Sequence, residues 1–272
     1  MGEHVSILTE LANRYLGHFA LALLASLHIT PENPALPIPQ HVVMGFILLV
    51  LTTLACLILK PQLSVEKPGT MQQTAEMLVT NPKWIGIRDI LDGAIPHHGR
   101  KYIYIVGSIG LFVLLANLMS LFPLFTAPTG NVSVPLACAS IAFVYFNYEG
   151  IRHQGLFGYL KQFAGPLWWI SWLIFPVEII STAARLLSLT VRLFANIFSS
   201  DLIYALFLGL LTQAFVGGWQ KSPALGIGLG IFPALVPLIF IGLHLLVAVV
   251  QALIFTILPA VYLSMATTAE EH

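Results

Sequence analysis

The sequence predicts an all-α integral membrane protein with about five membrane helices. Of its 272 residues, 57% are hydrophobic and only 9% are charged, against about 25% charged residues in an average soluble domain. A soluble fold of this length could not cover so much apolar surface with polar groups. The apolar residues also gather in runs of about 20 residues or more, the length that a helix needs to cross the hydrocarbon core.

The first 40 residues are expected to form an extracytoplasmic amphipathic segment that ends in a proline-rich linker over residues 31–40. They lack the basic region that begins a secretory signal peptide. The membrane domain is expected over residues 41–268, and residues 269–272 are expected to form a cytoplasmic tail. The net charge is zero, so nothing in the composition indicates a nucleic-acid partner.

Three apolar runs each fit one membrane span. They cover residues 42–59, 103–125 and 132–148. Between the first two runs, residues 69–95 are expected to form a helix on the cytoplasmic membrane surface. The apolar residues expected at that interface are Trp84, Ile85, Ile87, Ile90 and Leu91.

Two further apolar stretches, residues 167–216 and 224–267, are too long for upright spans. Fifty helical residues would reach about 75 Å, against a hydrocarbon core of about 30 Å. Each stretch therefore either folds into two spans or lies strongly tilted in the membrane. The residues alone do not decide, because Gly209, Pro233 and Pro237 can act as kinks or as breaks.

The positive charges predict the orientation. Eight of the 12 lysines and arginines fall in the segments after the first and third spans, which five crossings place on one side of the membrane. Because positive loops stay in the cytoplasm, the N-terminus is expected outside and the C-terminus inside. The eight residues are Lys60, Lys67, Lys83, Arg88, Arg100, Lys101, Arg152 and Lys161.

The most informative feature is a polar stripe in the fourth apolar stretch. Its seven residues are three or four positions apart, so they share one face of a helix. Asp201 lies nine residues beyond Arg192, which places it on the opposite face. The stripe consists of Glu178, Ser181, Arg185, Ser188, Arg192, Asn196 and Ser199.

Each charge at the bilayer centre costs about 2.5–3.5 kcal/mol, so these groups must face protein or water. Two interpretations stay open. The charges can form ion pairs that hold a helix bundle together, as Arg185 could with Glu178, or they can line a path for ions, which is the default for ionisable residues inside a membrane. An arginine keeps its proton even when desolvated, so Arg192 would supply a permanent positive charge.

The last stretch adds His244 and Gln251, seven residues apart and hence on one helix face. Histidine titrates near neutral pH, which suits a proton relay, and its neighbours in space are expected to include Asp201. A buried histidine that only packs in the core is the equal alternative. Gln251 is interpreted as a hydrogen-bonding partner of Arg192 across the helix pair rather than as a residue that only packs between the helices.

The sequence resembles a known family, the ATP synthase a subunits. Residues 187–196 read LSLTVRLFAN, which is similar to the family signature around its arginine. Residues 251–255 (QALIF) and 261–266 (VYLSMA) are similar to its C-terminal motif. Asn117 with Pro123, and residues 131–133, resemble its second- and third-span signatures. The resemblance covers about residues 40–268.

The resemblance implies a membrane-embedded stator subunit that couples proton flow to rotation and ATP synthesis. Arg192 would be the essential arginine that faces the carboxylates of a rotating c-ring. Asn196, Asp201, His244 and Gln251 match positions associated with two offset proton half-channels, and Glu178 matches a further acidic position. Arg185 and Ser188 are secondary candidates. No cofactor, metal or ATP-binding site is implied in this chain.

The family also implies an architecture and a set of partners. The last two helices would form a long, strongly tilted hairpin. The partners would be the c-ring, the b subunit of the peripheral stalk, the rest of the synthase and the lipids of a bacterial inner membrane. This sequence departs from the family at Thr190, at Ser199 and Ser200, where Ala-Gly is common, and at Asp201, where some relatives have Glu.

The mechanism expected from this resemblance is rotary. A proton would enter from outside through a half-channel lined by Asp201, His244 and Glu178 and neutralise a c-ring carboxylate. After nearly a full turn, that carboxylate would meet the inner half-channel and Arg192, which favours its ionised form. The choice between H⁺ and Na⁺ stays open, because it depends mostly on the partner's binding site.

Two other classes of function are less well supported. A secondary transporter usually shows internal repeats, and the Arg192 region has no counterpart in residues 40–150. A membrane enzyme would need a haem or metal site, but His97 and His98 have no spaced third ligand and indicate a solvated turn. Cys56 and Cys138 are isolated in apolar runs and indicate neither a disulfide nor a metal site. The sequence has no glycine-rich phosphate-binding loop.

Overall fold

The computed structural model describes residues 6–26, 28, 30–31, 33, 36–65, 67–80, 87–94, 99–122, 125–165 and 169–267, and every regular element in that part of the chain is a helix. The predicted all-α class is confirmed. The α-helices are α1 (Ile7–Ser26), α2 (Gln40–Leu59), α3 (Thr70–Thr80), α4 (Ile87–Ala94), α5 (Gly99–Met119), α6 (Ser133–Ala164), α7 (Ser171–Trp219) and α8 (Pro223–Thr267), and two 3₁₀ turns are η1 (Lys60–Gln62) and η2 (Pro128–Gly130).

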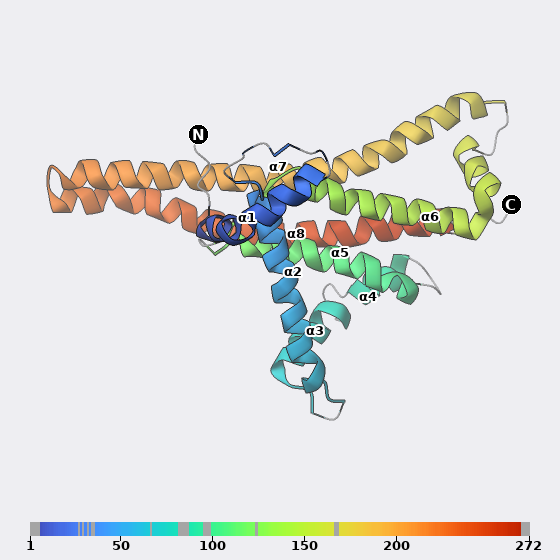
Figure 1. Ribbon diagram of the computed structural model, residues 1–272, viewed down its shortest axis with the longest axis horizontal. Coiled ribbons are helices and arrows are strands. Elements are labelled where there is room, and N and C mark those ends of the chain that lie inside the picture. The colour runs from blue at the N-terminus through green and yellow to red at the C-terminus, as the bar shows by residue number, and fades with distance from the viewer. Residues whose placement is uncertain are drawn as a thin grey trace.

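Five helices among the described residues are long and apolar enough to cross a membrane, as the sequence predicted. The two longest, α7 and α8, run side by side as a hairpin (Figure 1). Neither is broken: Pro233 and Pro237 lie within α8, and Gly209 lies within α7. At 1.5 Å per residue the 49 residues of α7 span about 73 Å. A helix of that length stays within a core of about 30 Å only if it runs obliquely.

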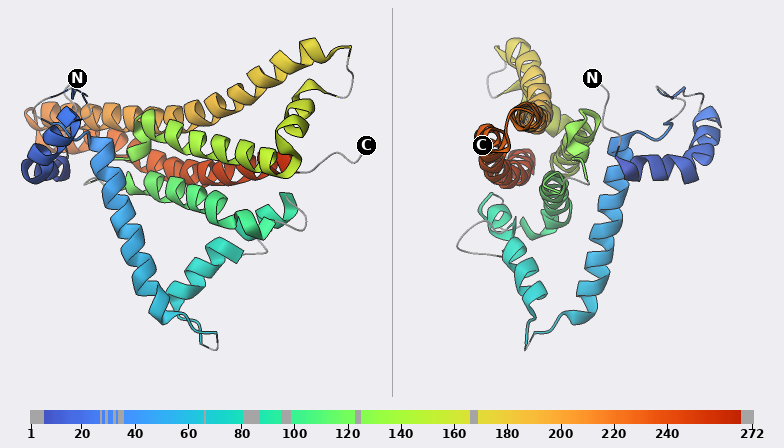
Figure 2. Two further views of the ribbon diagram at one scale, coloured as in Figure 1. Left: turned by 45° about the vertical axis from the view of Figure 1, so that its right-hand side comes forward. Right: turned by 90° about the vertical axis from the view of Figure 1, so that its left-hand side faces the viewer.

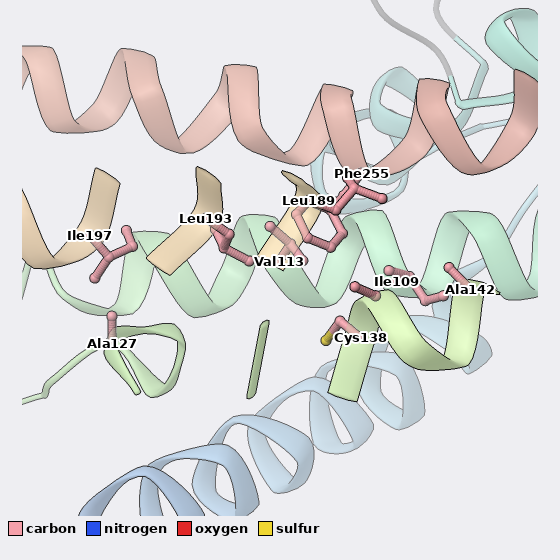
Figure 3. Close-up of a cluster of buried hydrophobic side chains, with 10 residues drawn as sticks. Ile109, Val113, Ala127, Cys138, Ala142, Leu189, Leu193, Ile197 and Phe255 are labelled. Carbon is pink, nitrogen blue, oxygen red and sulfur yellow. The ribbon is translucent and has the colours of Figure 1, made fainter. Parts of the chain in front are cut away.

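The helices α5, α6, α7 and α8 pack together around one apolar core (Figure 3). From α7, Leu189, Leu193 and Ile197 point into this core at intervals of four residues, as the helical repeat requires. Only 11% of the span in α7 is buried, against 50% of the span in α5. Most of the α7 surface is therefore left for lipid or for another protein.

Helix α2 leaves this bundle and extends away from it (Figure 2). Its first half touches the bundle, where Met44 and Leu48 pack against Ala116 and Met119 of α5. Helix α1 is fastened to the linker before α2, because Asn13 Nδ2 donates to the Ile38 carbonyl at 3.0 Å and Asn13 Oδ1 accepts from the Ile38 amide at 2.8 Å. Exposed apolar side chains follow α1 at a four-residue interval: Ile7, Leu11, Tyr15, Phe19 and Leu23.

The structure corrects two predicted boundaries. The second span ends as a helix at Met119 rather than at residue 125. The third was expected to end at residue 148, where polar residues begin, but α6 continues to Ala164. It bends at Gly155, whose φ of 74° is in the left-handed region that favours glycine.

The predicted surface helix over residues 69–95 appears as two helices in its described parts, α3 and α4. Leu91 was expected at the membrane interface, but it is fully buried against the bundle in a cluster that contains Tyr102 and Leu263. Helical periodicity identifies an apolar face without showing whether that face meets lipid or protein. Trp84, Ile85, His97, His98, Pro123 and the tail over residues 269–272 lie outside the described residues.

Polar side chains in the middle of α6 form ion pairs and hydrogen bonds in a cluster around Glu149, whose side chain is only 4% exposed. Lys101 Nζ of α5 donates to Glu149 Oε2 at 2.9 Å, and Arg152 and His153 approach the same carboxylate at 3.7 and 3.5 Å. This cluster allows α6 to continue as a helix past residue 148, because it gives the polar side chains partners within the protein.

We predict that Glu149→Ala destabilises the chain by about 1–3 kcal/mol, because it leaves Lys101 without its buried partner. Asp92→Ala is the matched control. Its ion pair with Arg88 is exposed on both sides and contributes less than about 1 kcal/mol. Thermal unfolding in detergent would measure both variants, and equal midpoints for the two would contradict the role assigned to the Glu149 cluster.

Candidate functional site

The guanidinium of Arg192 lies on the exposed surface of α7. Its Nη2 is 3.4 Å from Ser188 Oγ, one helical turn away. None of the described carboxylates is within ion-pair distance of it. Burying this charge in lipid without a partner would be costly. Arg192 is therefore suited to a carboxylate supplied by another protein.

Arg185, on the same stripe, does have a partner within the chain. Its Nη2 donates to Glu178 Oε1 at 3.2 Å, and its guanidinium lies 5.0 Å from the centre of the Tyr262 ring. The ion-pair interpretation therefore holds for Arg185 and Glu178 but does not extend to Arg192. Serine and asparagine complete the stripe, with Ser188 and Ser199 exposed and Asn196 half-buried.

His244 of α8 is buried and is bound on both ring nitrogens. Nδ1 is 2.6 Å from Ser200 Oγ of α7, and Nε2 is 2.8 Å from Ser120 Oγ and 3.2 Å from the Asn117 carbonyl. The ring is thus held between two other helices, which fixes its position and orientation.

A cavity of about 90 Å³ adjoins this histidine, with room for a few water molecules. Asp201 and His244 both line it, so the expectation that they are neighbours is confirmed. The η2 turn passes close to the carboxylate, since a Cβ atom on Gly130 would lie 3.8 Å from Asp201 Oδ2. The complete lining is Ser120, Leu121, Ser200, Asp201, Tyr204, Phe240, Ile241 and His244.

Two buried amides lie in the same bundle. Asn117 Oδ1 accepts a hydrogen bond from Thr129 at 2.8 Å, while its Nδ2 has no partner among the described residues. Gln251 is 2% exposed, and its Oε1 has no partner there either. The expected hydrogen bond from Arg192 to Gln251 is therefore not formed in this structure, because Gln251 faces the core and Arg192 faces outward.

Glu178 and Asp201 lie on opposite sides of Arg192 along one continuous helix. Glu178 precedes Arg192 by about 21 Å and Asp201 follows it by about 14 Å. A single half-channel lined by Asp201, His244 and Glu178, as expected from the sequence, does not fit this geometry. The site has two polar parts instead. Arg192, which forms no ion pair with a described carboxylate, lies between them.

Sequence reasoning did not assign a role to Ser120, Ser200 or Tyr204, and it used Asn117 only as part of a motif. A signal was present for Ser120, which follows Asn117 by three residues in an otherwise apolar run and so shares its helix face. The contact of Ser200 with His244 depends on how α7 and α8 pack, which the periodicity of one helix does not reveal.

Comparison with known proteins shows similarity over nearly the whole chain. The family model of the ATP synthase A chain matches residues 41–264. The chain is 35% identical to the ATP synthase subunit a of Koribacter versatilis (strain Ellin345) over 263 residues, which is 95% of each protein. It is also 35% identical to the ATP synthase subunit a of Solibacter usitatus (strain Ellin6076) over 260 residues, which is 96% of this chain and 99% of the relative.

The two buried amides give a testable contrast in stability. We expect Gln251→Met to keep or raise the thermal midpoint, because it removes an unpaired buried oxygen while keeping a similar volume. We expect Asn117→Leu to cost about 1–3 kcal/mol, because it leaves the buried Thr129 hydroxyl without its acceptor. Thermal unfolding in detergent compares them, and a larger loss for Gln251→Met would contradict the assigned environments.

Proposed function

Because the chain belongs to the ATP synthase A chain family, we propose that it is the proton-conducting stator subunit in the membrane sector of an F-type ATP synthase. The observation that carries the proposal is Arg192, an exposed and permanently charged side chain without an ion-pair partner among the described residues. It lies between two polar sites on the same helix, which fits a barrier between two proton paths.

The outer path is formed by the cavity at Asp201 and His244. A carboxylate and an imidazole that share a small cavity with room for water can pass a proton between them, and both are held on helices. A proton from this path neutralises a carboxylate of the c-ring. The neutral acid can then rotate into lipid without the cost of burying a charge.

Arg192 acts on each carboxylate as it returns. Its positive charge favours the ionised form of the acid, so the proton is released. Since an arginine does not give up its own proton, it blocks direct flow between the two paths. Asn196 and Ser188, one helical turn to either side, offer polar contacts on the same face of α7.

The inner path starts at Glu178 and Arg185. Tyr159 of α6 lies close enough to both for their charges to act on its hydroxyl, and that hydroxyl donates to Asn147 Oδ1 at 2.8 Å. These groups connect the first part of α7 to α6. Glu178 is thus proposed to take up the released proton, rather than to line the outer path.

The stripe on α7 faces the c-ring in this proposal, and Gln251 contributes to the outer path from within the bundle. The b subunit of the peripheral stalk holds the chain in place, and membrane lipids cover the remaining apolar surface. The N-terminus lies outside and the C-terminus in the cytoplasm of a bacterial inner membrane. This chain has no role in binding ATP.

Arg192→Ala is the first test of this function. Membrane vesicles with the complete synthase should lose proton-driven ATP synthesis, because the returning carboxylate no longer meets a fixed positive charge. Arg88→Ala, which removes an exposed arginine of α4, is the control and should keep synthesis. Retention of coupled synthesis by Arg192→Ala would refute the assigned role.

Asp201→Asn and His244→Ala test the outer path. Each variant removes a titratable group from the cavity, so the dependence of ATP-driven proton pumping on pH should change in both. Pumping is measured as acidification of vesicles over a pH series. If neither variant alters the profile, protons enter the complex elsewhere.

A further inference from the structure

Ser200 contacts the one nitrogen of His244 that can accept a proton. The Asn117 carbonyl can only accept hydrogen bonds, so its 3.2 Å contact with Nε2 is a hydrogen bond in the tautomer that carries the hydrogen on Nε2. The other contact of Nε2 agrees, because Ser120 Oγ already donates its own hydrogen to the Asn117 carbonyl at 2.9 Å and accepts from Nε2. In the neutral ring, Nδ1 is therefore the unprotonated nitrogen.

The partner of that nitrogen is fixed by the same reasoning. Nδ1 lies 2.6 Å from Ser200 Oγ, so in the neutral state the serine hydroxyl donates to it. Ser200 lines the same cavity as Asp201 and His244. Because Nε2 is engaged by Ser120 and Asn117, the contact of Nδ1 with the Ser200 hydroxyl is the one that joins an accepting ring nitrogen to the cavity. The titratable groups of the cavity lining that face His244 are Asp201 and Tyr204, both from α7.

From this geometry we propose that Ser200 is a relay residue, through whose hydroxyl protons from the cavity reach His244. The inference rests on the proposed function and adds a residue to it. In the transfer, Ser200 Oγ–H breaks as Nδ1–H forms. At the same time Oγ takes a proton from a hydronium ion in the cavity or from the carboxylic acid of Asp201. The products are an imidazolium, an intact serine hydroxyl and water or the Asp201 carboxylate.

Substitutions at position 200 can separate the role of the hydroxyl from that of side-chain size. Glycine at position 200 would leave space beside Nδ1 for a water molecule, which can donate the same hydrogen bond. Alanine would fill part of that space with a methyl group and offer no donor. The relay therefore predicts an order among substitutions that side-chain size alone does not.

The test uses the complete ATP synthase in vesicles and the initial rate of ATP-driven acidification. Ser200→Ala should pump about a hundredfold more slowly, the lower end of the effect of removing a positioned proton-transfer group. Ser200→Thr should be near wild type, and Ser200→Gly should lie between them. Ser108→Ala is the matched control, because Ser108 on α5 is exposed and its hydroxyl bonds to the Ile105 carbonyl of its own helix.

A double-mutant cycle with His244→Gln shows whether Ser200 acts through the histidine. If it does, Ser200→Ala has no further effect once His244 is replaced. An equal loss in both backgrounds, an unchanged rate for Ser200→Ala, or no effect of His244→Gln would each overturn the relay. None of these results touches the stator function, which fails only if the wild-type complex does not pump or Arg192→Ala stays coupled.

Discussion

The structure depends on one constraint: a guanidinium that cannot lose its proton has to be placed within a membrane without an ion-pair partner among the described residues. Such a charge is tolerable only where another protein or water meets it. Helix α7 satisfies this by turning Leu189, Leu193 and Ile197 into the bundle while Arg192 stays on an exposed face. The low burial of α7 agrees with the proposed role, since a buried arginine could not meet a carboxylate of another protein.

The same helix separates the two proposed proton paths. Arg192 and Asp201 are nine residues apart and so lie on opposite sides of the buried apolar row. Asp201 faces the cavity with His244, while Glu178 pairs with Arg185 at the other end of the stripe. Because α7 is continuous, these parts are held at fixed distances from one another. The long hairpin with α8 thus provides a single rigid support for the two proposed proton paths and the arginine between them.

Much of this could be predicted from the sequence, and the limits have a physical cause. The spacing of Glu178 to Ser199 identified the polar face of α7, because a helical repeat is a property of one segment. Contacts between segments were less accessible. Gln251 faces the core and does not face Arg192. Leu91 is buried by α5 and α8. Helix α6 continues past residue 148 because Lys101 neutralises Glu149. The contacts of Ser120 and Ser200 with His244 likewise depend on how three helices pack.

The central claim is that the Arg192 face of α7 meets an acidic helix of a neighbouring ring, and disulfide cross-linking tests it most directly. The native cysteines, Cys56 and Cys138, are first replaced by serine. Ser188→Cys, one turn from Arg192, is then oxidised with a cysteine placed one turn from the carboxylate of the c subunit. We expect this pair to cross-link and Leu189→Cys, which faces the buried core, not to do so. A cross-link from position 189 and none from position 188 would contradict the account.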